Sequence, residues 1–213
     1  MSAQVKEYLT IFDEASGEIV EKKSRFIATV IHVESEEEAV SHIERLKKLY
    51  WDARHNCYAF ILGMGSETMR FSDDGEPSGT AGKPILEVLK GRGLTNVLVV
   101  VTRYFGGVLL GTGGLVRAYT DSTQEGINNS DIKKMTLMQR VSVHVDYNSV
   151  GKLKYVLASD SIEVVDEIYT DSVQIDIALP VDNISQITDK ITDVTSGKAT
   201  FDLGDISYYP TAI

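Results

Sequence analysis

The sequence predicts an α+β protein built from two domains, and three observations support this prediction. At 213 residues the chain is longer than the roughly 100–150 residues that one hydrophobic core commonly serves. Strand-like runs rich in Val, Ile and aromatic residues alternate with segments whose apolar residues recur every three to four positions. Around residues 129–134 the polarity rises and the pattern starts again, so we expect a first domain at 1–132 and a second at 135–213.

In the first domain, the first two strands are expected on either side of a turn at residues 15–17. Ser35 with Glu38 three positions later is a capping box, which predicts the start of a helix with one apolar stripe. The run 96–102 is almost entirely Val and Leu, which indicates a strand buried on both faces. The expected elements are strands at 7–12 and 25–33, a helix from 36 to 50, strands at 56–62 and 67–71, a helix at 81–89, a strand at 96–102 and a helix from 115 to about 128.

In the second domain, the expected order is strand, helix, strand, strand, helix, strand, which is the ferredoxin-like signature. Asn148 or Ser149 is expected to cap the first of its helices, and Gly197 to end the second. The corresponding ranges are 136–146, 150–159, 163–169, 172–179, 181–195 and 199–208.

The composition excludes several classes of protein. Hydrophobic residues make up 43% of the chain and charged residues 24%, so we expect a folded core rather than disorder. The single cysteine, Cys57, excludes an internal disulfide and favours a reducing compartment. No apolar run approaches the ~20 residues that span a bilayer, and no apolar signal-peptide core is present. We therefore expect a cytoplasmic protein.

The net charge of −10 is unevenly distributed. Residues 135–213 carry 5 basic and 12 acidic side chains, whereas residues 70–119 carry six basic and four acidic ones. An acidic protein adheres poorly to duplex nucleic acid, because nonspecific binding is mainly neutralisation of phosphates. The basic stretch leaves open a local face for structured RNA.

The densest group of candidate functional residues lies in the polar loop 70–84. Asp73, Asp74 and Glu76 could hold a hard cation such as Mg²⁺, which takes one or two carboxylates plus waters. They lack EF-hand spacing, and the preferred alternative is that they cap backbone NH groups and pair with a nearby arginine. The free NH groups at the start of the following helix offer an anion site.

A glycine-rich loop at 106–114 lies between the buried strand and the next helix, an arrangement that can cradle phosphate. Gly111, Gly113 and Gly114 are its candidate anion-binding residues. The Walker motif fails, because Thr112 and Gly113 stand where Lys and Ser/Thr are required, and the dinucleotide fingerprint lacks its third glycine. The alternative is a tight turn that lets the helix pack against the sheet.

Arg103, Tyr104 and Phe105 stand at the carboxyl end of the buried strand, where ligands of α/β folds tend to bind. An arginine flanked by aromatic residues can bind phosphate and stack on bases or peptide groups. The alternative is that Tyr104 or Phe105 belongs to the core, since strand alternation sends one of them inward. We expect at least one of the three on a functional surface. Arg117, early in the next helix, can share that face.

His55 and Cys57 are two residues apart on a predicted strand, so they point to the same face. A nucleophilic Cys–His pair or half of a metal site is one interpretation. No second cysteine exists and the other histidines show no ligand spacing, so a buried thiol beside a hydrogen-bonded histidine is preferred. We expect no catalytic residue, no resident metal and no cofactor, with Mg²⁺ as the weak exception.

Four motifs resemble the YigZ/YvyE branch of the IMPACT family. They are KSRF at 23–26, HNCYA at 55–59, SDDGEPSGTAGKP at 72–84 and RYFGGVLLGTGGLVRAY at 103–119. The resemblance spans the whole chain but is weak after residue 135. It implies an N-terminal domain with the fold of ribosomal protein S-five domain two and elongation factor G domain four. It also implies a ferredoxin-like C-terminal domain similar to elongation factor G domain five.

The resemblance carries over no catalytic residue, and it implies a link to translation, because eukaryotic relatives restrain the amino-acid-starvation kinase by competing for its activator. We therefore expect a non-catalytic module that contacts the ribosome, an RNA or a translation factor. One alternative is a small enzyme or a nucleotide- or phosphate-binding protein that uses the glycine-rich cleft. Another is an interaction domain whose acidic C-terminal half docks a basic partner. The expected binding face combines Arg103, Tyr104, Phe105, Arg117 and Lys83 with the acidic loop at 73–76.

Overall fold

The computed structural model describes residues 4–211 and shows an α+β protein with two sheets and five helices in that part of the chain. Its described residues divide into two compact units, one of residues 4–134 together with 211 and one of residues 135–210. No helix among residues 4–211 has both the length and the apolar character that crossing a membrane requires.

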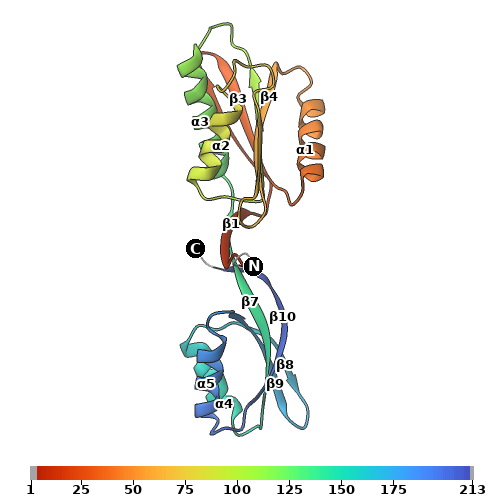
Figure 1. Ribbon diagram of the computed structural model, residues 1–213, viewed down its shortest axis with the longest axis vertical. Helices are drawn as coiled ribbons and strands as arrows, with labels where there is room; N and C mark the ends of the chain where they lie inside the picture. Colours follow the sequence, from red (N-terminus) through yellow and green to blue (C-terminus); the bar gives the residue numbers. More distant parts are fainter. Residues whose placement is uncertain (1–3, 212–213) are drawn as a thin grey trace. The chain divides into compact units, whose positions relative to one another are not determined.

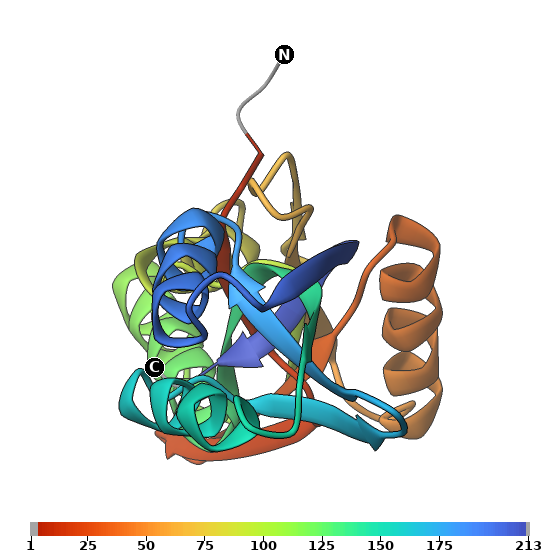
Figure 2. The same cartoon turned by 90° about the horizontal axis from the view of Figure 1, so that it is seen from below.

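The first unit contains an antiparallel sheet whose strand order differs from the chain order, with helices on both faces. Its strands lie in the order β2-β3-β6-β4-β5, with α2 and α3 on one face and α1 on the other (Figures 1 and 2). In chain order the elements are β1 Glu7–Ile11, β2 Ala15–Glu21, β3 Ser24–His32, α1 Glu36–Leu49, β4 His55–Leu62, β5 Thr68–Ser72, α2 Gly82–Gly91, β6 Val97–Tyr104 and α3 Thr112–Asn128.

Two hydrophobic clusters sandwich this sheet, and β6 contributes to both. Val97, Val99 and Val101 lie in the cluster beneath α2 and α3, whereas Leu98 and Val100 lie in the cluster beneath α1. The prediction that this run is a strand buried on both faces is confirmed. Because β6 occupies the centre of the sheet, anything that follows it in sequence emerges at the middle of one sheet end.

The start of α1 agrees with its predicted capping box. Ser35 Oγ accepts a hydrogen bond from the backbone N of Glu38 at 3.1 Å, and the Glu38 carboxylate accepts one from the backbone N of Glu34 at 2.8 Å. These bonds satisfy amide groups that have no partner inside the helix.

The turn predicted at residues 15–17 is wrong, because these residues belong to β2. Gly17 is required there for packing: a Cβ on it would lie 2.5 Å from the backbone N of Gly126 in α3. The turn of the β2–β3 hairpin instead falls at Lys22 and Lys23, whose φ angles are 46° and 66°. Two positive φ values in a two-residue hairpin turn match the right-handed twist of the strands.

The helix predicted from Leu115 begins three residues earlier, at Thr112. Gly111 precedes it with a φ of 73°, and Gly113 and Gly114 are the second and third residues of the helix. A Cβ on Gly114 would approach the Leu110 side chain to 3.0 Å, so this glycine allows the loop to fold closely over the first turn.

The second unit has the predicted ferredoxin-like order. Its strands lie in the order β10-β7-β9-β8, and α4 and α5 cover one face of that sheet (Figure 1). The apolar side chains of β7 and β9 pack beneath the two helices to form its core. The elements are β7 Ile132–Val145, α4 Val150–Ser159, β8 Val164–Tyr169, β9 Val173–Pro180, α5 Ile184–Val194 and β10 Thr200–Thr211.

The helix predicted from residue 181 begins at Ile184, because residues 180–183 form a turn in which Asn183 N donates to the carbonyl of Pro180 at 2.8 Å. At the other end Gly197 adopts a φ of 76°, and its N donates to the carbonyl of Thr192 at 2.8 Å. The role expected for Gly197 in ending this helix is confirmed.

Candidate functional site

The most polar part of the interior is a network centred on Glu76. Its Oε1 accepts hydrogen bonds from Nη1 of Arg103 at 2.5 Å and from the hydroxyl of Tyr119 at 2.9 Å. The side chains of Glu76 and Arg103 are only 3% and 6% exposed. The loop after β5, the end of β6 and the middle of α3 are therefore tied together by one carboxylate.

Arg103 was expected at the surface, and the structure places it inside. The reason is that β6 is the central strand, so its last residues are covered by neighbours on both sides. The guanidinium lies 5.3 Å from the ring centroid of Phe26 and 5.7 Å from that of Phe105. Its positive charge is neutralised by Glu76, and this arginine is not available for direct contact with an external phosphate.

Asp73 uses its carboxylate to bind the backbone ahead of α2. Its Oδ1 accepts from the backbone N of Ala81 at 3.0 Å and of Gly82 at 2.8 Å, and its Oδ2 accepts from the N of Gly79 at 2.8 Å. A carboxylate beside the positive end of a helix dipole is a favourable arrangement. The amides considered as an anion site at the start of this helix are therefore occupied by the chain itself.

Asp74 is also fully engaged. Its Oδ2 accepts from the backbone N of Asn56 at 2.7 Å, and its Oδ1 accepts from Nζ of Lys47 at 2.7 Å. With Glu76 bound to Arg103, each of the three acids makes the kind of bond that the capping interpretation requires. Among residues 4–211 no group of three or more His, Cys, Asp or Glu side chains is arranged to hold a metal ion.

Cys57 and His55 flank the same network. Sγ of Cys57 lies 2.9 Å from the carbonyl oxygen of Asp73 and 3.3 Å from the hydroxyl oxygen of Tyr119, so its one hydrogen has two acceptors within reach. Burial raises the pKa of Cys57 to about 12, so the thiol stays protonated at neutral pH and is a poor nucleophile. His55 Nδ1 donates to the carbonyl of Asp74 at 2.9 Å. Burial also raises the pKa of Tyr119 far above its usual range.

Above this network, several chain segments meet at one end of the sheet. The registers place Arg25 of β3 opposite Tyr104, and His55 of β4 opposite Arg103. The β2–β3 turn, the residue before β4 and the residues after β6 therefore share that end. A Cβ on Gly106 would lie 2.0 Å from the carbonyl carbon of Lys23, so this glycine allows the loop after β6 to touch the hairpin turn.

We call this region the sheet-end surface and define it by Lys22, Lys23, Arg54, Phe105 and Arg117. The Arg54 guanidinium lies 5.7 Å from the Phe105 ring centroid, and Lys22 and Arg117 line one hollow of about 350 Å³. Within residues 4–211, none of these four cationic side chains has an ion-pair partner, although Glu21 and Asp121 line the hollow as well.

Apolar side chains lie exposed beside these cations. Phe105 is 39% exposed, and Leu109 in the following loop is 84% exposed. Trp51 is 82% exposed and precedes Asp52, which accepts a hydrogen bond from the Tyr104 hydroxyl at 2.9 Å. Unpaired cations beside exposed rings are suited to binding a partner that carries both negative charge and flat apolar groups.

The residues predicted to form one binding face lie in three places: the interior, which holds Arg103, the sheet end, and a groove between two helices. Phe105 and Arg117 lie exposed on the sheet-end surface, whereas Tyr104 is half-buried and its ring lies under Arg25. Lys83 lies apart, in a groove between α2 and α3.

Sequence reasoning missed Lys22, Lys23 and Arg54. Two adjacent lysines between two strand-like runs indicate a hairpin turn with exposed cations. Because the turn was predicted at residues 15–17, this pattern at Lys22 and Lys23 was not recognised.

Comparisons with known proteins match both units. A model described as the Impact N-terminal domain matches residues 22–127, and one described as a domain of unknown function, DUF1949, matches residues 143–198. The IMPACT family member YvyE of Bacillus subtilis is 38% identical over 97% of this chain and 95% of its own length. The IMPACT family member YigZ of Escherichia coli is 35% identical over 83% of this chain and 87% of its own.

One further relative matches only part of the chain, and one solved structure matches nearly all of it. The Protein IMPACT homolog of Dictyostelium discoideum is 41% identical over 44% of this chain and 28% of its own length. A crystal structure of a hypothetical protein is 32% identical, with a TM-score of 0.61 over 96% of this chain and 99% of that one.

Proposed function

Because this chain belongs to the IMPACT family, we propose that it is a non-catalytic module of translation or its regulation, which binds RNA through the sheet-end surface. The observation that carries this proposal is the contrast between the two layers of the site. The inner polar groups, apart from Nε of Arg103, bind one another, whereas the outer cations have no ion-pair partner within residues 4–211 and Arg54 stands beside the exposed ring of Phe105.

The inner layer supports a non-catalytic role. A nucleophile or general base needs a group that is free to react with a substrate. Cys57 is a protonated, buried thiol, and the carboxylates of Asp73, Asp74 and Glu76 are each engaged by donors of the chain itself. These residues give the loops around the sheet end one defined conformation, which is what a binding surface requires.

The outer layer favours a nucleic acid with unpaired bases. Lys23 and Arg54 can neutralise phosphates, while Phe105 presents a half-exposed ring on which a base can stack. Three or four phosphate contacts to single-stranded RNA correspond to a log–log salt slope of about −2 to −3. Such a shallow slope matches a local basic surface on a protein whose net charge is −10.

The proposal is tested by fluorescence anisotropy of a labelled single-stranded RNA about 12 nucleotides long, titrated with the full chain. Phe105→Ala is expected to weaken binding by about 5- to 150-fold, the equivalent of one lost stacking contact. Lys23→Gln combined with Arg54→Gln is expected to make the salt slope shallower by about 1.4, because two phosphate contacts are lost.

Lys152→Gln is the matched control, because Lys152 is an exposed lysine of α4 in the other unit. It should leave both affinity and slope unchanged. Binding that is equally tight in all variants would remove the sheet-end surface from consideration. Sedimentation of the same variants with ribosomes separates binding to free RNA from binding to RNA within the ribosome.

A second candidate, a nucleotide or phosphate ligand on the glycine-rich loop, is supported by one observation. The first turn of α3 has no acidic residue and no side-chain cap, so within residues 4–211 its amides around Gly113 and Gly114 lack the partner that Asp73 gives α2. A ligand at 100 times its Kd adds about 2.7 kcal/mol of stability. The absence of any thermal shift with nucleotides and Mg²⁺ would eliminate this candidate.

A further inference from the structure

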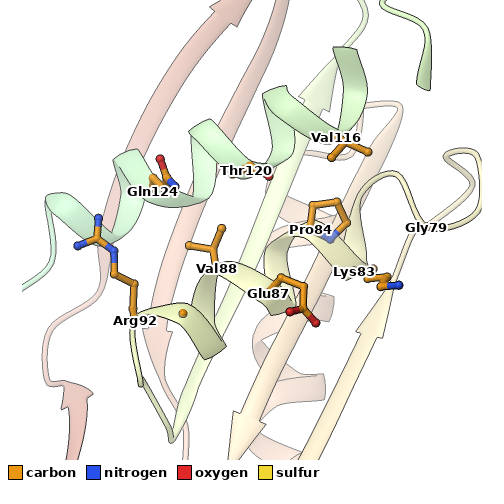
Figure 3. Close-up of a pocket in the computed structure, with 10 residues that line it drawn as sticks. Gly79, Lys83, Pro84, Glu87, Val88, Arg92, Val116, Thr120 and Gln124 are labelled. Carbon is orange, nitrogen blue, oxygen red and sulfur yellow. The ribbon is translucent and has the colours of Figure 1, made fainter. Parts of the chain in front are cut away.

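A groove of about 630 Å³ lies between α2 and α3, the two helices on one face of the first unit (Figure 3). It is bounded by two rows of side chains spaced four residues apart. One row is Pro84 and Val88 of α2 with Arg92 just past its end, and the other is Val116, Thr120 and Gln124 of α3. Residues four apart form a ridge along a helix, so the groove is the channel between two ridges.

The floor of the groove is apolar and its two ends are cationic. Pro84, Val88 and Val116 supply the apolar surface, and Val116 is 38% exposed although it lies on a helix that packs against the sheet. Lys83 stands at one end and Arg92 at the other (Figure 3). Within residues 4–211 the Lys83 side chain has no hydrogen-bond or ion-pair partner, and the Arg92 side chain donates one bond, to Oδ1 of Asn128 at 2.9 Å.

Lys83 is unfavourably placed for the stability of its own helix. It is the second residue of α2, and a cation in the first turn opposes the positive end of the helix dipole. Arg92, just past the last turn, is favourably placed by the same criterion. A lysine at the wrong end of a helix, beside an exposed apolar floor, is better explained by an acidic ligand than by folding.

The chemistry of the groove also defines the conformation of its occupant. Its walls are helices, whose internal backbone groups already pair within each helix, so an extended peptide would find no backbone partners there. A helix satisfies its own backbone and can pack a ridge of apolar side chains between the two ridges. From Pro84 to Arg92 the groove is about 12 Å long, which corresponds to roughly two turns of the bound helix.

We infer that the α2–α3 groove is a docking site for an amphipathic helix of a partner protein, with two turns of apolar side chains and an acidic residue at each end. Glu87, at the middle of the groove and paired with Lys90 at 3.1 Å, repels an acid placed between those ends. The required pattern is therefore acid, apolar stripe, acid. With one carboxylate and two cations, the groove is poorly suited to binding a polyanion such as RNA. Its expected ligand therefore differs from that of the sheet-end surface.

The test uses two fluorescein-labelled helical peptides about 16 residues long that share one apolar stripe. One peptide has Glu at both ends of the stripe and the other has Lys. Titrated with the full chain and followed by anisotropy, the Glu peptide is expected to bind at least about tenfold more tightly than the Lys peptide, because two surface attractions become repulsions. Equal affinities, or no binding of the Glu peptide, would overturn the inference.

The double variant Lys83→Glu/Arg92→Glu is expected to reverse this preference, and Lys152→Glu is the matched control that should not. Lys83→Glu places an acid in the first turn of α2, which favours the helix, so loss of binding cannot be ascribed to its unfolding. A variant that still prefers the Glu peptide refutes the inference. Lys23→Gln should keep peptide binding intact, so the groove can fail or succeed independently of the RNA proposal.

Two further measurements decide between occupants. If the wild-type chain self-associates in sedimentation equilibrium and the double variant does not, the occupant is a second copy and the partner helix is excluded. If inorganic phosphate or RNA displaces the Glu peptide, the groove is an anion site and the helical ligand is equally excluded. The helical ligand is supported if the wild-type chain does not self-associate, if neither phosphate nor RNA displaces the Glu peptide, and if the double variant reverses the peptide preference.

Discussion

Breaking the ion pair between Glu76 and Arg103 should destabilise the first unit severely. Arg103→Met removes the cation but leaves the Glu76 carboxylate 3% exposed, hydrogen-bonded to the hydroxyl of Tyr119 and with Nε2 of His55 3.9 Å away. Removing one partner of a buried pair costs about 3–5 kcal/mol, mainly because the remaining charge stays desolvated. That is a large fraction of the roughly 5–15 kcal/mol by which a protein of ordinary stability is folded.

The lone cysteine provides the assay. Cys57 is completely buried in this unit, so its reaction with a thiol reagent in a urea series reports opening of the first unit and not of the second. The midpoint for Arg103→Met should fall by an amount that corresponds to about 3–5 kcal/mol at an unchanged m-value. Tyr119→Phe, which removes one hydrogen bond to the same carboxylate, is the matched comparison and should cost about 1.5–3 kcal/mol.

The pair of variants Glu76→Gln and Arg103→Met closes a double-mutant cycle. The double variant should be less destabilised than the sum of the two, with a coupling of about 2–3 kcal/mol, because neither change then leaves an unpaired buried charge. A cost below about 1 kcal/mol for Arg103→Met, or strict additivity in the cycle, would refute the interpretation of this pair as the structural centre of the site.

Three further predictions, made with four substitutions, test other parts of the structure. The pKa of Cys57 is raised to about 12 in the folded chain from a reference of 9.0, so the unfolded chain loses the thiol proton first. The free energy of unfolding should therefore fall by about 1.4 kcal/mol per pH unit as the pH rises above 9. Denaturation of Cys57→Ala at about pH 8.5–10 should show a smaller pH slope. Gly17→Ala should cost about 1–3 kcal/mol in thermal unfolding, because the new Cβ meets the backbone of α3. Gly113 lies on α3 itself, where a Cβ meets open space, so Gly113→Ala should stabilise by about 0.5–1 kcal/mol. Equal effects of the two substitutions would contradict the packing argument. Asp73→Ala should raise amide hydrogen exchange at the start of α2 and cost about 1–2 kcal/mol, and unchanged exchange at Gly82 would show that the carboxylate is not its cap.

Local patterns in the sequence were sufficient for most of the elements. The capping box at Ser35, the Val-rich run of β6 and the βαββαβ order after residue 132 each depend on neighbours along the chain, and each is present in the structure. Of the acids in the loop after β5, only Asp73 acts locally, because its carboxylate binds the amides of Gly79, Ala81 and Gly82. Asp74 and Glu76 instead bind Asn56 and Arg103, which lie 18 and 27 positions away.

The position of a residue in the sheet could not be determined in this way. The sequence by itself determined most of the strands and helices, with β2 as an exception, and that charged and aromatic side chains follow β6. Only the tertiary structure decided that β6 is the central strand, which buries Arg103 against Glu76, and that Gly17 packs on α3, which moves the hairpin turn to Lys22 and Lys23. The physical reason is that burial depends on partners brought from far along the chain: Glu76 lies 27 positions from Arg103, and no local periodicity records their contact.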